Sequence, residues 1–164
     1  MASKKVIDAL NKQINAEIHS SYLYLAMSAY FETTPYKGMA KWMKLQSAEE
    51  YEHAMRIYDY VIRIGADVEL EEIQKPKANW SSPQTVFEAA KKHELFITDR
   101  INKIADLAQQ EKDHATSSFI KWFVDEQVEE VATVTEIVEK FDAIGDSKHS
   151  LFWLDKELKK REEK

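Results

Sequence analysis

Apolar positions recur every three to four residues over four long segments of the chain, which is the spacing of one face of an α-helix. The prolines Pro35, Pro76 and Pro83 fall in the gaps between these segments, where a helix would have to end. No segment alternates at period two over a useful length, so no β-sheet is expected. The predicted helices span residues 4–33, 37–65, 83–110, 113–143 and, as a short fifth helix, 148–161.

The ends of these helices carry the residue types that cap helices. Gly38, Gly65 and Gly145 each follow a long periodic segment, and at each we expect a left-handed helix terminus, which glycine adopts without strain. Ser82 followed by Pro83 is typical of an N-cap with proline in the first turn.

The four long helices are of similar length, about 40–45 Å at 1.5 Å per residue, and their apolar stripes favour a four-helix bundle. The gaps near residues 34–36 and 111–112 are short, so each joins two antiparallel neighbours. Residues 66–82 are too many for a bundle corner, and extended they reach about 55 Å, enough to run the length of the bundle. We therefore predict an all-α fold, with one long crossover between two hairpins and a short fifth helix, as one domain over residues 1–164.

Composition limits the kinds of chemistry. The chain has 164 residues, no cysteine, and 23 basic against 29 acidic residues, which gives a net charge of −6. Disulfides, thiolate metal sites and cysteine nucleophiles are excluded, so any metal must be held by oxygen and imidazole. The acidic balance argues against nucleic acid as a partner. No apolar run approaches the ~18–20 residues of a membrane span, and no signal peptide is evident, so a cytoplasmic protein is expected.

Each apolar stripe is interrupted near its middle by polar residues that can bind metal. They are Glu17 on the first helix, Glu50 and His53 on the second, Glu94 on the third, and Gln127 and Glu130 on the fourth. An isolated buried carboxylate costs several kcal/mol, and four at one level of one core would repel each other. Two divalent cations would neutralise all four. The alternative is that the stripes are displaced by one residue, which would have to happen on four helices at the same depth.

The spacing of these residues matches that of diiron carboxylate bundles. Glu50 and His53 form a Glu-x-x-His pair, Glu17 and Glu94 are single carboxylates, and Gln127 and Glu130 have the corresponding spacing. The remaining polar residues leave alternatives open. Glu49, Glu126 and Glu129 lie beside the centre and form either a third cation site or a solvated acidic flank. Tyr24 could be an electron donor, a hydrogen-bond partner, or a core residue with a satisfied hydroxyl.

At these residues the sequence resembles the ferritins, and most closely the non-haem bacterial and archaeal type. The resemblance covers essentially the whole chain. Its most specific stretches are residues 48–54 (Ala-Glu-Glu-Tyr-Glu-His-Ala), 92–94 (Lys-His-Glu) and 122–130 (Trp-Phe-Val-Asp-Glu-Gln-Val-Glu-Glu).

The resemblance implies a ferroxidase centre with two irons. Glu17, Glu50 and His53 would hold the first iron, with Glu50 bridging. Glu94 and Glu130 would hold the second iron, with Gln127 close by as a weak ligand or hydrogen-bond donor. It also implies a third iron site at Glu49, Glu126 and Glu129, and it places Tyr24 as the tyrosine near the centre.

Two departures from the bacterioferritin pattern lead us to predict no haem. A bacterioferritin would carry Glu-x-x-His on the fourth helix, where this chain has Gln127 and Glu130. Its haem-ligating methionine would fall just before His53, where Glu52 stands.

The function implied is iron storage, with Fe(II) oxidised by O2 or peroxide and the ferric mineral kept inside a hollow homo-oligomer of 24 subunits. The fifth helix, with Leu151, Phe152, Leu154 and Leu158, is a candidate subunit contact. One rival is a different diiron oxidase, such as a peroxidase or oxygenase. The other is a non-catalytic assembly protein with a vestigial acidic core.

Overall fold

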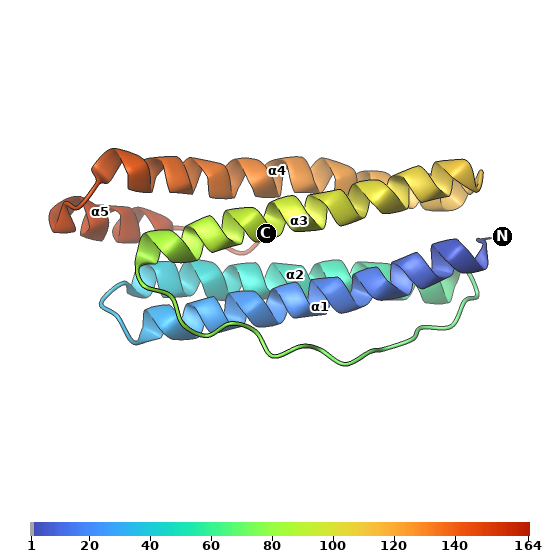
Figure 1. Cartoon of the computed structure of the whole chain (residues 1–164), viewed down its shortest axis with the longest axis horizontal. Helices are drawn as coiled ribbons and strands as arrows, with labels where there is room; N and C mark the ends of the chain where they lie inside the picture. Colours follow the sequence, from blue (N-terminus) through green and yellow to red (C-terminus); the bar gives the residue numbers. More distant parts are fainter. Residues whose placement is uncertain (1) are drawn as a thin grey trace.

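The computed structural model describes residues 2–164 and folds them into five helices with no strand in that range (Figure 1). The predicted bounds agree with it to within three residues, the largest difference being at the end of the fifth helix. No helix in this range combines the length and apolarity needed to span a bilayer. The helices are α1 (Lys4–Glu32), α2 (Lys37–Arg63), α3 (Pro83–Gln110), α4 (His114–Ile144) and α5 (Lys148–Leu158).

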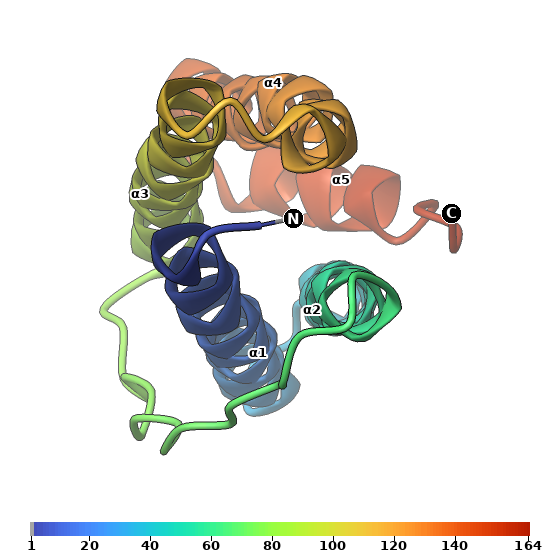
Figure 2. The ribbon, with the colours of Figure 1, turned by 90° about the vertical axis from the view of Figure 1, so that its right-hand side faces the viewer.

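The four long helices form two antiparallel hairpins, α1 with α2 and α3 with α4, and the long crossover returns the chain along the outside of α1 (Figures 1 and 2). Two asparagines of α1 fasten the crossover. The Asn11 side chain donates to the Asp67 carbonyl at 3.0 Å and accepts from the Glu69 amide at 3.1 Å, and Asn15 donates to the Glu72 carbonyl at 3.0 Å. The predicted topology, with one bundle-length connection, is therefore confirmed.

The core is divided into two apolar clusters. One cluster surrounds Phe31, Met43 and Phe87, and the other surrounds Leu10, Ile57 and Ile101. The acidic residues singled out above belong to neither, because they occupy the level between the two clusters on each helix. A polar layer is thus enclosed from both ends of the bundle.

The expectation for the glycines holds at two positions and is wrong at the third. Gly65 and Gly145 have φ of 76° and 54° and follow α2 and α4. Gly38, however, lies in the first turn of α2, and its φ is not positive. Its role is close approach, because a Cβ built there would lie 2.0 Å from the Asp155 carbonyl oxygen of α5. Glycine at this position lets α5 pack directly on the α2 backbone.

Most of the apolar face expected to be a subunit contact on α5 instead packs inside the chain. Leu154 and Leu158 are buried in the core, and Leu151 is partly buried against the same cluster. Phe152 is 50% exposed and remains for an external contact, together with Trp153, which was not part of that prediction and is 51% exposed.

We predict that Gly38→Ala lowers the free energy of unfolding by about 1–3 kcal/mol. Replacing glycine by alanine inside a helix normally raises the free energy of unfolding by up to about 1 kcal/mol. A decrease at Gly38 would therefore be due to the clash with α5. Chemical denaturation followed by circular dichroism measures the change. Lys44→Ala, at an exposed position of the same helix, is the control and should be neutral or slightly stabilising. A stabilised Gly38→Ala variant would contradict the close approach.

Candidate metal centre

The metal-binding residues expected from the sequence are buried together at one level of the bundle. Glu17, Glu50 and Glu94 are each 1% exposed, and Glu130 is 5% exposed. His53 is 6% exposed. The one-residue displacement that would move these acids to the solvent boundary is therefore wrong.

Three sets of residues each have ligand atoms within 4.8 Å of one another and draw on more than one helix, and two of these sets share Glu50. The first set is Glu17, Glu50 and His53, and the second is Glu50, Glu94 and Glu130. Glu50 belongs to both, so its carboxylate lies where it could bridge two ions. Its Oε2 is 3.3 Å from Nδ1 of His53, the pair that the Glu-x-x-His spacing puts on one face of α2.

Three glutamines donate hydrogen bonds to these carboxylates, and two of them were not predicted as site residues. Gln13 donates to Glu17 at 2.8 Å. Gln46 donates to Glu50 at 2.8 Å and to Glu130 at 2.9 Å. The signal in the sequence was the i, i+4 spacing of Gln13 with Glu17 and of Gln46 with Glu50, which places each amide one turn before a carboxylate.

Arginines fix the orientation of both of these amides. Arg100 donates to Oε1 of Gln13 at 3.0 Å, and Arg161 donates to Oε1 of Gln46 at 2.8 Å. Because a guanidinium only donates, it holds the amide oxygen on its own side and leaves the amide nitrogen facing the carboxylate.

Gln127 was predicted to be a weak ligand or a hydrogen-bond donor, and its geometry here is that of a donor. Its amide nitrogen lies 3.1 Å from Oε2 of Glu94 and 3.1 Å from Oγ1 of Thr98. Tyr24 is fully buried and its hydroxyl donates to Oε1 of Glu94. Both oxygens of the Glu94 carboxylate thus accept a hydrogen bond.

Burial raises the pKa of every carboxyl group in this layer. Burial, and then the neighbouring Glu50 charge, raises the pKa of Glu17 to about 8. Burial, followed by the charge of Glu94, raises the pKa of Glu130 to about 7. Burial also raises the pKa of Glu50 and of Glu94, and for Glu50 the Glu94 and Glu130 charges add to it.

The residues present fit divalent cations. Oε2 of Glu17 and Oε1 of Glu130 are buried and have no hydrogen-bond partner, although the glutamines satisfy the other oxygen of each carboxylate. Four carboxylates and one imidazole, all oxygen and nitrogen donors, match the preferences of iron, manganese or zinc. Two such ions would supply the four positive charges that the layer lacks.

The three residues expected to form a third site are not gathered into one ligand set. Glu126 is grouped with His53 and Glu130 within 4.8 Å. Glu49 is 2.8 Å from Arg161, and one of its oxygens is buried without a partner. Glu129 is exposed and lines a cavity of about 250 Å³ that Glu49 also lines.

The family comparison covers most of the chain. Residues 7–144 match the model of the ferritin-like domain. A protein named bacterial non-heme ferritin from Bacteroides fragilis is 42% identical over 161 residues, which are 98% of this chain and 100% of that protein. A protein of the same name from Staphylococcus saprophyticus is 38% identical over 98% of this chain and 96% of its own length.

Solved structures with the same fold also match almost the whole length of this chain. A chain described as a novel open pore ferritin from the hyperthermophilic archaeon Archaeoglobus fulgidus has a TM-score of 0.97 and 46% identity, over 99% of this chain and 100% of its own. A chain described as a humanized archaeal ferritin has a TM-score of 0.98 and 46% identity, over 100% and 99% of the two chains.

We predict that the metal-free protein loses stability as pH rises from 5 to 8. An acid whose pKa is raised on folding binds more protons when folded. Its contribution to the free energy of unfolding is therefore fully present below the unfolded pKa of about 4.5. That contribution is lost as pH rises through the folded pKa, about 7 for Glu130 and about 8 for Glu17. Each group lowers the free energy of unfolding by at most about 1.4 kcal/mol per pH unit. Chemical unfolding at a series of pH values, in the presence of a chelator, measures it.

The variant Glu17→Gln/Glu130→Gln should flatten this pH dependence, because the amides do not titrate. Glu139→Gln, at an exposed position of α4, should leave it unchanged. A double variant with the same slope as the parent would contradict the assignment of the raised pKa values to this layer.

Proposed function

The chain belongs to the ferritin family, and from that premise we propose that it stores iron and oxidises Fe(II) at a diiron centre within each subunit. The observation that carries the proposal is the pair of buried ligand sets that share Glu50. One set would hold each iron, with Glu17 and His53 on the first, and Glu94 and Glu130 on the second. Glu50 would bridge the two irons.

Fe(II) is the substrate of this centre, and O2 or hydrogen peroxide is the oxidant. Two Fe(II) ions give up one electron each, and the two electrons with two protons reduce one O2 to H2O2. The protein contributes the spacing of the ions and a buried layer of carboxylates that would hold them. The carboxylates must release their protons to bind the ions, so iron binding is coupled to proton release.

Hydrogen-bond donors hold the carboxylates in place for this reaction. Gln46 contacts Glu50 and Glu130 together, while Gln127 and Tyr24 each contact one oxygen of Glu94. Burial, and next the Glu94 charge, raises the pKa of Tyr24 well above its ordinary value, so its hydroxyl keeps its proton and acts as a donor. We assign Tyr24 and Gln127 to positioning Glu94. A third iron site at Glu49, Glu126 and Glu129 remains part of the proposal.

Storage requires an enclosed volume, which one 19.1 kDa bundle cannot provide. We propose a hollow homo-oligomer of 24 subunits. Apolar side chains exposed on the chain support assembly, since a monomer would leave them in water. They are Tyr22 and Leu25 on α1, Leu70 on the crossover, and Phe152 and Trp153 on α5. A cytoplasmic location, and the absence of haem and of nucleic-acid partners, stay predictions.

The two rival functions have less support. A different diiron oxidase has less support, because the relatives that match 98% and 99% of this chain are ferritins. A non-catalytic assembly protein would have no need of ligand residues on all four long helices, with each carboxylate held by a donor.

We predict that Glu50→Ala/His53→Ala slows Fe(II) oxidation in air at least about 100-fold, because it removes the bridging carboxylate and the imidazole together. The initial rise in ferric absorbance measures the rate. The control, Glu139→Ala/His114→Ala, removes the same residue types from exposed positions of α4. Oxidation by the site variant as fast as that of the parent would overturn the proposed centre.

We also predict that the purified protein forms a particle of about 24 chain masses that gains mass when loaded with Fe(II) in air. Native mass spectrometry or sedimentation, with and without iron, measures both quantities. A chain that stays monomeric or dimeric while oxidising iron would exclude storage and leave the oxidase activity standing.

A further inference from the structure

The segment after α5, residues 159–164, lies against α2 through a partly buried arginine. The Arg161 guanidinium donates to the Trp42 carbonyl at 3.2 Å and to Oε1 of Gln46 at 2.8 Å. It also lies 2.8 Å from Oε2 of Glu49, and its carbon is 4.3 Å from the centre of the Trp42 ring. The Lys41 ammonium holds the start of the segment through the Lys159 carbonyl at 3.0 Å. These five contacts fix the segment at this place.

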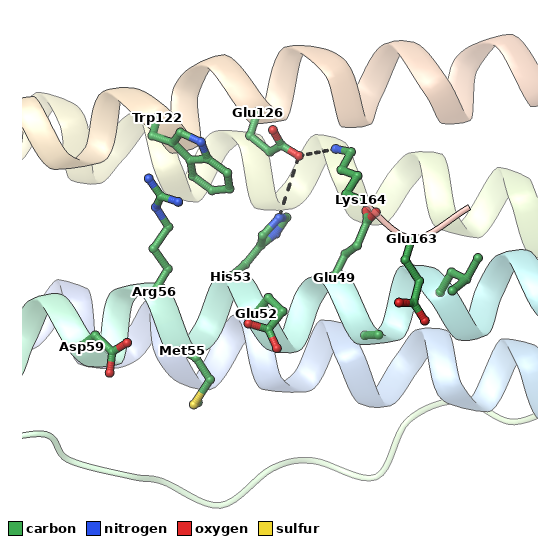
Figure 3. A pocket seen from close by; sticks show the side chains of 12 residues that line it. Glu49, Glu52, His53, Met55, Arg56, Asp59, Trp122, Glu126, Glu163 and Lys164 are labelled. Carbon is green, nitrogen blue, oxygen red and sulfur yellow. Dashed lines mark hydrogen bonds and ion pairs between the residues drawn. The ribbon is translucent and has the colours of Figure 1, made fainter. Parts of the chain in front are cut away.

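The same segment brings a second cation to the edge of the metal centre. Nζ of Lys164 lies 2.5 Å from Oε1 of Glu126, and that oxygen is 3.9 Å from Nε2 of His53 (Figure 3). Glu126 is one of the three residues whose ligand atoms gather with those of His53 and Glu130. Figure 3 shows Glu126 between the imidazole and the ammonium, on the wall of a pocket of about 580 Å³.

The two acids that these cations contact are largely buried, and each needs a positive partner. The side chains of Glu49 and Glu126 are each 13% exposed. A carboxylate with so little access to water is costly unless a cation lies next to it. Arg161 satisfies only one oxygen of Glu49, since the other is buried without a partner. Oε1 of Glu130 is also buried without a partner, and Glu130 belongs to the same ligand group as Glu126.

We propose that residues 159–164 occupy the place of a metal ion in the metal-free protein. Arg161 pairs with Glu49 and Lys164 pairs with Glu126, until a bound metal ion displaces the segment. This inference rests on the proposed function, and it concerns the third site of that centre. Oε1 of Glu126, which accepts the ammonium, is also the oxygen 3.9 Å from Nε2 of His53, so a metal ion held with His53 would compete with Lys164 for it. The segment and a metal ion therefore exclude each other, and each weakens the binding of the other by the same factor.

Displacement of residues 159–164 would also affect the four buried carboxylates, because Gln46 contacts both Arg161 and two of these carboxylates. Arg161 holds the oxygen of the Gln46 amide, and the nitrogen of that amide donates to Glu50 and Glu130. When the segment leaves, Gln46 loses the contact that fixes its orientation. Metal at the third site is in this way linked to the carboxylates that bind the first two ions.

The first test is calorimetric titration of the assembled, metal-free protein with Zn²⁺, which binds oxygen and nitrogen ligands and undergoes no redox reaction. The variant Arg161→Gln/Lys164→Gln removes both cations. The control, Lys159→Gln/Lys160→Gln, removes two charges from the same segment; Lys160 pairs with the exposed Glu157, away from the site. We expect the weakest of three binding events per chain to tighten about tenfold in the first variant and to stay unchanged in the control.

A second measurement uses the parent protein and needs no variant to fold. Brief acetylation with acetic anhydride, quantified by mass spectrometry, reports how accessible each lysine is. Lys164 should react slowly in the metal-free protein and at least about threefold faster when Zn²⁺ is bound, while Lys160 in the same segment keeps its rate.

The outcomes separate the inference from the proposed function. Two tight Zn²⁺ events in the parent, with a third event that is absent, unchanged or weaker in Arg161→Gln/Lys164→Gln, would overturn the displacement while leaving the diiron centre intact. A Lys164 acetylation rate that Zn²⁺ leaves unchanged would do the same. Loss of all tight Zn²⁺ binding in the parent would overturn both.

Discussion

Four carboxylates buried at one level of a helical core are the constraint on which the rest of this structure depends. Each is almost fully removed from water, and each lies close to another acid. Such a layer can exist with protons bound, with hydrogen-bond donors around it, or with cations inside it. Hydrogen-bond donors surround this layer, burial raises the pKa of its acids, and the oxygens that remain without partners mark where cations would bind.

The division of the core explains why the layer cannot relieve its charge by local opening. Apolar clusters close the bundle on both sides of it, one around Phe87 and the other around Ile101. Fraying of the helix ends would leave the layer buried, because it lies near the middle of helices 27 to 31 residues long. Compensation must therefore come from inside the bundle, through protons, hydrogen-bond donors or bound cations.

The sequence was sufficient for the helices, the crossover and the acids of the layer, because these follow from local spacing and from short or long gaps. It was insufficient wherever a residue acts through a partner distant in the chain. Gln46 lies one helical turn before Glu50, yet its contacts with Glu130 and Arg161 join residues 84 and 115 positions away in the chain. Gly38 looked like a helix terminus because nothing local indicates that α5 packs on it. Nothing local in the charged residues from 156 onward indicates that the side chain of Arg161 is mostly buried.

The arginines show how a polar layer is controlled from its surface. Arg100 and Arg161 each hold a glutamine by its amide oxygen, so the opposite side of that amide can only donate to a carboxylate. The two arginines differ in what holds them. Arg100 belongs to α3 and moves only with the bundle, whereas Arg161 belongs to a segment fixed by a few side-chain contacts. Replacing those contacts costs far less than moving a helix, so any adjustment of the layer to its metal content should occur first on the side of Arg161 and Gln46.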